Sequence, residues 1–137
     1  MIESIRHRRS IRKFTSDPID PEKLETVLEA ARLAPSGNNK QPWTFIVVQS
    51  EQQRLAVMEA CHRQTWMMTA PAFIVAVADM AARVANKPGL YIDENSPDWE
   101  LKRAIRDTAI ATENLLLEAD AQGLGTCWVG FFVQSEI

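Results

Sequence analysis

Four side chains near the start of the chain have the chemistry of an anion site. Arg8, Arg9 and Arg12 carry guanidinium groups, and Ser10 places a hydroxyl between them. A guanidinium group binds phosphate through two parallel, charge-assisted hydrogen bonds. From these residues alone, a solvated basic patch at the end of a short helix is the more common explanation, and a phosphate site is the alternative.

A turn rich in proline, glycine and asparagine is the second candidate. It reads Pro35-Ser36-Gly37-Asn38-Asn39-Lys40-Gln41-Pro42-Trp43. Proline cannot continue a helix, and glycine and asparagine accept left-handed backbone angles. Such a turn exposes backbone amides and polar side chains at a rigid corner. By itself it is best interpreted as a helix stop, and a ligand contact is the alternative.

The third candidate segment lies near the end of the chain. It reads Gly123-Leu124-Gly125-Thr126-Cys127-Trp128-Val129-Gly130. Locally, this pattern predicts a helix cap at Gly123 that leads into a strand over Cys127 to Val133. Cys127 has no histidine or cysteine nearby in sequence, so we expect a small buried thiol rather than a nucleophile.

Hydrophobic periodicity predicts the elements that position these segments. A short helix is expected from Ile2 to Arg6. Asp20 is placed to cap a second helix, with Pro21 in its first turn, that runs to about Ala34. The buried face of that second helix is predicted from the i, i+3, i+4, i+7 spacing of Leu24, Val27, Leu28 and Ala31.

Further along the chain, strands and helices alternate. The apolar runs Trp43 to Val48 and Pro71 to Ala78 predict buried strands. Ser50 and Gln53 have the spacing of a capping box for the helix between them. The longest helix is expected to end at Gly123, and its apolar stripe consists of Leu101, Ile105, Ala109, Thr112, Leu116 and Ala119. We interpret the Ala81 to Trp99 segment as an irregular connection.

Length and charge limit the possible functions. The 137 residues, 46% of them hydrophobic, predict one domain over residues 1–137. A net charge of -3, from 15 basic and 18 acidic residues, disfavours a nucleic-acid partner. No apolar stretch approaches the about 20 residues needed to span a bilayer, and the first six residues lack the apolar core that a signal peptide would have.

The cysteine and histidine content gives further expectations. The chain has two cysteines and two histidines, which form no cluster, so no metal site is expected. Both cysteines are expected to be reduced. We predict a cytoplasmic protein that acts on a small molecule. Trp66, Met67 and Met68 are expected to pack in the core.

The three segments, in this order, resemble the nitroreductase family of FMN enzymes. Strands alternating with helices predict an α/β sandwich. The resemblance implies more, namely an α/β (α+β) three-layer sandwich whose largely antiparallel central sheet is flanked by helices. It also implies an intertwined homodimer with the flavins at the subunit interface.

The resemblance also implies a role for each segment. Arg8 and Ser10 would contact the phosphate and ribityl chain of FMN, with Arg9 beside them and Arg12 near the pyrimidine edge of the flavin. A cation at that edge would stabilise the negative charge of the reduced ring. The turn would reach the flavin of the partner subunit, where the residues in contact with it would be Pro35, Ser36, Gly37 and Asn39.

The third segment would then lie beside the reactive atom of the flavin. The resemblance places the backbone of Val129 and Gly130 near N5, and a glycine lets a backbone amide approach closely. No side chain is expected to be catalytic, because the flavin carries the chemistry. The implied function is an FMN-dependent oxidoreductase that passes hydride from NADH or NADPH through flavin to a nitroaromatic, a quinone or a similar acceptor.

Two other functions remain open at this point. One is a non-catalytic relative of the same fold that binds FMN or senses a ligand. The other is a flavin enzyme of different chemistry, such as reductive dehalogenation or flavin fragmentation, because one fold supports several reactions. Family members usually continue for several tens of residues beyond the Trp-Val-Gly segment, so we expect a shortened relative or a truncated chain.

Overall fold

Two antiparallel strands form the centre of the molecule. The computed structural model describes residues 1–84 and 96–137, so most of the expected connection between Ala81 and Trp99 lies outside the described residues. Strand β1 (Trp43–Val48) pairs with β2 (Phe73–Ala78), from Trp43 opposite Ala78 to Val48 opposite Phe73. The β-branched and aromatic residues of both runs fit a pleated sheet.

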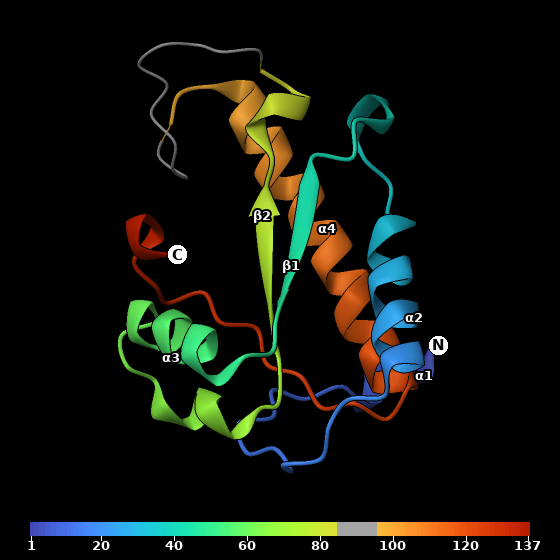
Figure 1. Cartoon of the computed structure of the whole chain (residues 1–137). Helices are drawn as coiled ribbons and strands as arrows, with labels where there is room; N and C mark the ends of the chain where they lie inside the picture. Colours follow the sequence, from blue (N-terminus) through green and yellow to red (C-terminus); the bar gives the residue numbers. More distant parts are fainter. Residues whose placement is uncertain (85–95) are drawn as a thin grey trace.

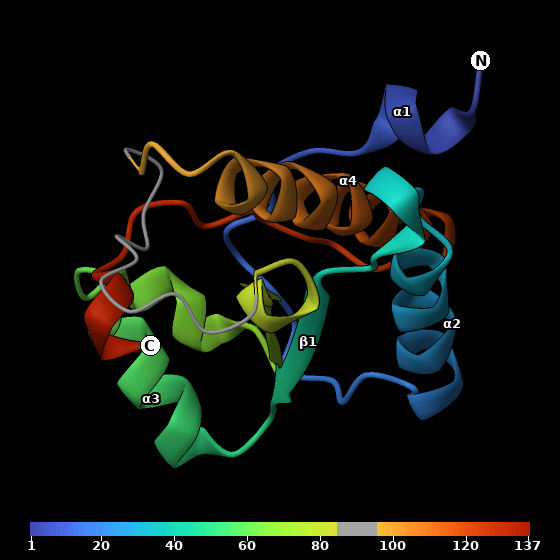
Figure 2. The ribbon, with the colours of Figure 1, turned by 90° about the horizontal axis from the view of Figure 1, so that it is seen from above.

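Helices cover this sheet on both sides. Figures 1 and 2 show α2 and α4 on one side of the strands and α3 on the other, which confirms the α+β sandwich. The α-helices are α1 (Glu3–His7), α2 (Pro21–Arg32), α3 (Glu51–Ala60) and α4 (Trp99–Ala121). The short 3₁₀ helices are η1 (Gly37–Asn39), η2 (Thr65–Thr69), η3 (Met80–Ala82) and η4 (Gln134–Glu136).

The main core lies between α2, α4 and one face of the sheet. Its buried residues are Val27, Ala31, Leu115, Leu116 and Ala119. Phe45 and Ile74 reach this cluster from the two strands. The predicted apolar face of α2 is thus confirmed. The burial of such a face contributes more to the stability of a helix than helix propensity does.

A second cluster lies on the other face of the sheet. Met58, Cys61 and Met67 are buried there, and Phe73 and Val129 pack against them. The expected core role of the Trp66 to Met68 segment is confirmed. Burial raises the pKa of the Cys61 thiol, so this group stays protonated at neutral pH.

The helix caps predicted from the sequence are present. The Asp20 side chain accepts a hydrogen bond from the Glu22 amide at 2.9 Å, and Pro21 is the first residue of α2. Ser50 Oγ accepts from the Gln53 amide at 3.3 Å. Gln53 does not complete the expected capping box, because its Oε1 accepts from the Ser50 hydroxyl at 2.8 Å.

The strand expected from Cys127 to Val133 is wrong. Among the described residues, no β-bridge involves this segment. The nearest one pairs Thr126, just before the segment, with Ser10. Further on, the Val133 amide bonds to the Ala60 carbonyl at 2.9 Å, at the end of α3. Apolar and β-branched residues do not make a strand without a neighbouring backbone that satisfies their amides.

Gly123 ends α4 as predicted. Its φ of 75° lies in the left-handed region. The Leu124 amide bonds to the Ala119 carbonyl at 2.8 Å, and the Gly123 amide bonds to that of Asp120 at 3.0 Å. These two bonds define a Schellman cap, which turns the chain back beneath the sheet.

We predict that Gly123→Ala lowers the free energy of unfolding by about 1 kcal/mol, because a left-handed backbone penalises a Cβ atom. No atom lies within 4 Å of the added Cβ, so the loss is a backbone effect. Gly130→Ala is the matched control, since its nearest neighbour would be 3.7 Å away and its φ is not left-handed. Urea denaturation checks both, and equal stabilities for the two variants would contradict the assignment.

Candidate functional site

The first and third candidate segments lie side by side. The Ile11 amide donates to the Thr126 carbonyl at 2.8 Å, next to the parallel bridge between Ser10 and Thr126. A Cβ atom at Gly125 would lie 3.1 Å from the Ile11 side chain. The glycine therefore allows the two segments to approach closely.

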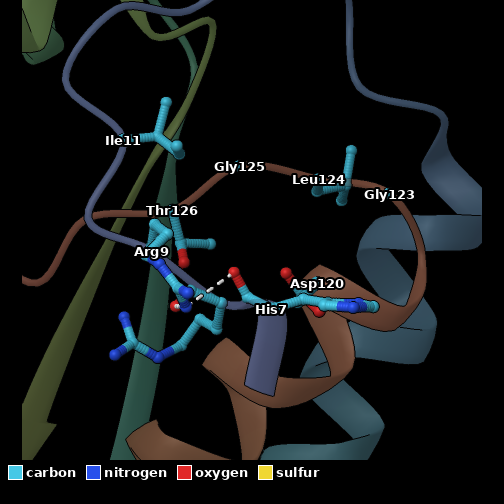
Figure 3. Close-up of a pocket in the computed structure, with 9 residues that line it drawn as sticks. His7, Arg9, Ile11, Asp120, Gly123, Leu124, Gly125 and Thr126 are labelled. Carbon is cyan, nitrogen blue, oxygen red and sulfur yellow. Dashed lines mark hydrogen bonds between the residues drawn. The ribbon is translucent and has the colours of Figure 1, made fainter. Parts of the chain in front are cut away.

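The two segments enclose a hollow at the end of α4. Figure 3 shows Arg9 and Thr126 close together on one side of it, and Asp120 on the last turn of the helix. Its lining residues are His7, Arg8, Arg9, Ile11, Asp120, Gly123, Leu124, Gly125 and Thr126. Two of the four predicted anion-binding residues, Arg8 and Arg9, thus line one concave surface.

Arg8 and Arg9 differ in what they bind. Arg9 Nη1 donates to the carbonyls of Arg6 at 2.7 Å, Arg8 at 2.8 Å and His7 at 3.1 Å, and so caps α1. The half-buried Arg8 side chain has no hydrogen bond or ion pair with any residue that the structure describes. Its guanidinium group is therefore available to an anion.

Arg12 and Ser10 lie on the same segment but outside the lining. The Arg12 guanidinium carbon is 5.8 Å from the centre of the Trp66 ring, a cation–π contact that holds the side chain over η2. Ser10 is exposed, and its backbone pairs with Thr126. The contacts predicted for these two residues with a cofactor remain predictions.

The turn from Pro35 to Asn39 lies elsewhere. Figure 1 shows η1 beyond the Trp43 end of β1, far from the C-terminal end of α4, where the residues that line the hollow lie. Ser36 Oγ accepts from the Gln41 amide at 2.9 Å, and Asn39 Oδ1 accepts from Gln41 Nε2 at 3.2 Å. One copy of the chain therefore does not bring the turn and the hollow together.

Val129 and Gly130 continue from the hollow toward α3. Val129 packs against the Met58 and Met67 cluster, and Gly130 is exposed. Among the described residues, neither backbone amide donates to another backbone carbonyl. Cys127 is half-buried rather than buried as expected, with its Sγ 3.6 Å from the Trp128 carbonyl oxygen.

Sequence reasoning missed a network of charges behind the turn. The Arg83 side chain is 1% exposed and pairs with Asp107 and Glu100. Asp107 also accepts a hydrogen bond from the Gly37 amide at 3.1 Å. No sequence signal pointed to it, because the predicted apolar stripe of this helix runs through Ile105, which is exposed. The structure instead buries Asp107 and Thr108, and a buried carboxylate needs a partner.

The comparisons with known proteins agree with this geometry. The sequence model of the Nitroreductase family matches residues 5–137. This chain belongs to the nitroreductase family. The resemblance carried by the three segments is thereby confirmed.

Relatives within the nitroreductase family match most of the chain. An Archaeoglobus fulgidus protein, provisionally named NADH dehydrogenase/NAD(P)H nitroreductase, is 35% identical over 98% of this chain and 70% of its own length. A nitroreductase family protein from Clostridium novyi NT has a TM-score of 0.79 and 34% identity, covering 98% of this chain and 72% of that one.

An FMN-dependent nitroreductase from Clostridium difficile R20291 is also similar in structure. Its TM-score is 0.76 at 30% identity, and the match covers 94% of this chain. The match covers 65% of that relative, so this nitroreductase-family chain spans about two thirds of its length.

In residues 1–84 and 96–137, no group of three or more histidine, cysteine, aspartate or glutamate side chains is arranged to hold a metal ion. In the same residues, no helix is long and apolar enough to cross a membrane.

The charge network behind the turn shifts two pKa values. Burial of Arg83 opposes its charge, but hydrogen bonds to Asp107 and Glu100 outweigh this effect and raise the pKa of Arg83. The hydrogen bond from Arg83 lowers the pKa of Glu100, burial opposes this effect, and Arg103 adds to the lowering. Arg83 and Glu100 therefore stay charged at neutral pH.

We predict that Glu100 makes stability depend on pH below its ordinary pKa of 4.5. Because its folded-state pKa is lowered, its stabilisation is complete above 4.5 and is lost as the pH falls through the lower folded value. Urea denaturation at neutral and acidic pH should show a smaller acid loss for Glu100→Gln than for the wild type. Glu29, whose pKa is also lowered, is present in both proteins and contributes equally to both. If the stability of the two proteins falls in parallel with pH, this role of Glu100 is contradicted.

Proposed function

We propose that this nitroreductase-family chain is an FMN-dependent oxidoreductase. It would take hydride from NADH or NADPH and pass electrons to a small-molecule acceptor such as a nitroaromatic or a quinone. The observation that carries the proposal is the half-buried Arg8 guanidinium, which lines the hollow and has no partner among the described residues.

The hollow fits the phosphate end of FMN. A guanidinium group without a protein partner in the described chain is a strong phosphate ligand, because it donates two parallel hydrogen bonds. The Ser10 hydroxyl lies two residues further along and forms no hydrogen bond with the described residues. The name of the Clostridium difficile relative, which is FMN-dependent, agrees with this cofactor.

The backbone beyond the hollow fits the ring end. The amides of Val129 and Gly130 bond to no backbone carbonyl in the described chain, and the exposed Gly130 has no side chain to obstruct a ring. Arg12 would supply positive charge near the pyrimidine edge of the ring. When bound, FMN accepts and donates hydride at N5, and the residues named here would bind and orient it.

A homodimer would complete the site. The turn from Pro35 to Asn39 lies far from the C-terminal end of α4 (Figure 1), which borders the hollow, so a second copy would have to supply it. Apolar side chains are exposed on the surfaces that such a copy would cover, among them Leu33 at the end of α2 and Ile105 and Ile110 on α4.

We also infer a cytoplasmic location, where NADH and NADPH are available. The two free cysteines, Cys61 and Cys127, agree with a reducing compartment.

Changing Arg8 and Ser10 together tests the cofactor assignment. The variant Arg8→Gln, Ser10→Ala loses a charged and a neutral hydrogen-bond donor, so we expect FMN affinity to fall about 10- to 100-fold or more. Fluorescence titration of FMN measures the dissociation constant, and oxidation of NADPH with an added quinone measures turnover.

Arg32→Gln is the matched control for that variant. Arg32 also carries a guanidinium group, but its ion pair with Glu29 is exposed and lies on α2. Its FMN affinity should equal that of the wild type. Unchanged FMN binding by the Arg8 and Ser10 variant would overturn the assignment, and FMN binding without NADPH oxidation would favour the non-catalytic relative.

A further inference from the structure

We propose that Arg83 and Asp107 are positioning residues for the candidate flavin turn. They would hold Gly37 in the conformation in which the Pro35 to Asn39 turn meets the flavin ring. The inference rests on the proposed function in two respects, namely that this turn contacts FMN and that a second copy of the chain brings the turn to the flavin.

Both backbone polar groups of Gly37 are bound by this side-chain pair. The Gly37 amide donates to Asp107 Oδ2 at 3.1 Å, and Arg83 Nη2 donates to the Gly37 carbonyl at 3.0 Å. Arg83 Nη2 also donates to Asp107 Oδ2, which closes the ring of contacts. The position of Gly37 is therefore fixed by two residues that are distant in sequence.

Two further charges hold the pair itself. Arg83 Nη1 donates to Glu100 Oε2 at 3.0 Å, and Arg103 Nη1 donates to Glu100 Oε1 at 3.0 Å. The resulting group has two cations and two anions, so its net charge is zero. Such a network keeps the Arg83 guanidinium from rotating away from Gly37.

A contribution to stability does not by itself explain why this charge network is present. A buried ion pair gains little over a well-packed apolar pair, because both charges lose their hydration. Arg83 Nε, moreover, is buried with no hydrogen-bond partner among the described residues. An unpaired buried donor costs free energy. The position of the guanidinium group therefore satisfies Gly37 and the two carboxylates but leaves its own Nε without a hydrogen bond.

The helix that supplies Asp107 also holds the far end of the turn. Thr108 Oγ1 donates to the Pro42 carbonyl at 2.9 Å. Between these two anchors, Asn38, Asn39 and Gln41 have left-handed φ values of 56°, 53° and 48°. Strained backbone of this kind persists only where its surroundings determine it, and adjacent residues of α4 supply that constraint.

A side chain at position 37 would crowd the two guanidinium groups beside it. A Cβ atom there would lie 2.6 Å from Arg103 Nη2 and 3.0 Å from Arg83 Nη2. Because Arg83 is held by two carboxylates, it has little room to retreat. The glycine therefore serves the close approach of a guanidinium group to the backbone.

Asp107→Asn tests the proposal in the full chain. The amide oxygen can still accept from Gly37, but the charge that holds Arg83 is lost. In the protein without flavin, hydrogen–deuterium exchange of the peptide from 36 to 42 should accelerate about tenfold or more. Affinity for FMN and for riboflavin, which lacks the phosphate, should fall by the same factor, because the turn would contact the ring.

Two other variants make the test decisive. Thr108→Val removes the second anchor without changing the charge and should act in the same direction, so the proposal remains testable if Asp107→Asn does not fold. Arg32→Gln breaks an exposed ion pair and should change neither readout.

The outcomes separate the inference from the proposed function. Faster exchange in the turn with an equal loss of FMN and riboflavin affinity supports the inference. Faster exchange with unchanged flavin affinity, or unchanged exchange in both variants, overturns it and leaves the proposed function standing. Failure of the wild type to bind FMN overturns both.

Discussion

The burial of one side of α4 is the constraint on which the rest of the structure depends. Its C-terminal half packs Leu115, Leu116 and Ala119 against α2 and the sheet. Its N-terminal half presents Asp107 to the turn at Gly37. The Gly123 cap then directs the chain toward the segment that carries Ser10. One helix thus positions both candidate contact regions at opposite ends of the domain.

The elements with local signals could be predicted from the sequence. Asp20 and Gly123 mark helix ends through their own backbone chemistry, and the spacing of Val27 and Ala31 identifies a buried face. The expected strand after Cys127 failed because pairing is not local. Aromatic and β-branched residues describe a strand, but only a neighbouring backbone makes one, and here the chain bonds to the end of α3 instead.

The candidate site shows the same difference between local signals and contacts that are distant in sequence. Residue types marked the basic segment, the turn and the Gly-rich segment, and family membership confirms the resemblance on which their roles depend. That Arg9 caps α1 while Arg8 stays without a partner in the described chain follows from geometry alone. The Arg83–Asp107 pair joins positions far apart in sequence, and Asp107 lies outside the apolar stripe that the sequence predicts for α4.

Anaerobic mixing of the FMN-loaded protein with NADPH tests the central claim most directly. We expect the visible absorbance of bound flavin to bleach in a single turnover and to return when a quinone is added, because hydride reaches the ring and leaves it again. Bound flavin that keeps its oxidised spectrum with both NADPH and NADH would contradict the account. The chain would then be a flavin-binding member of the family without turnover.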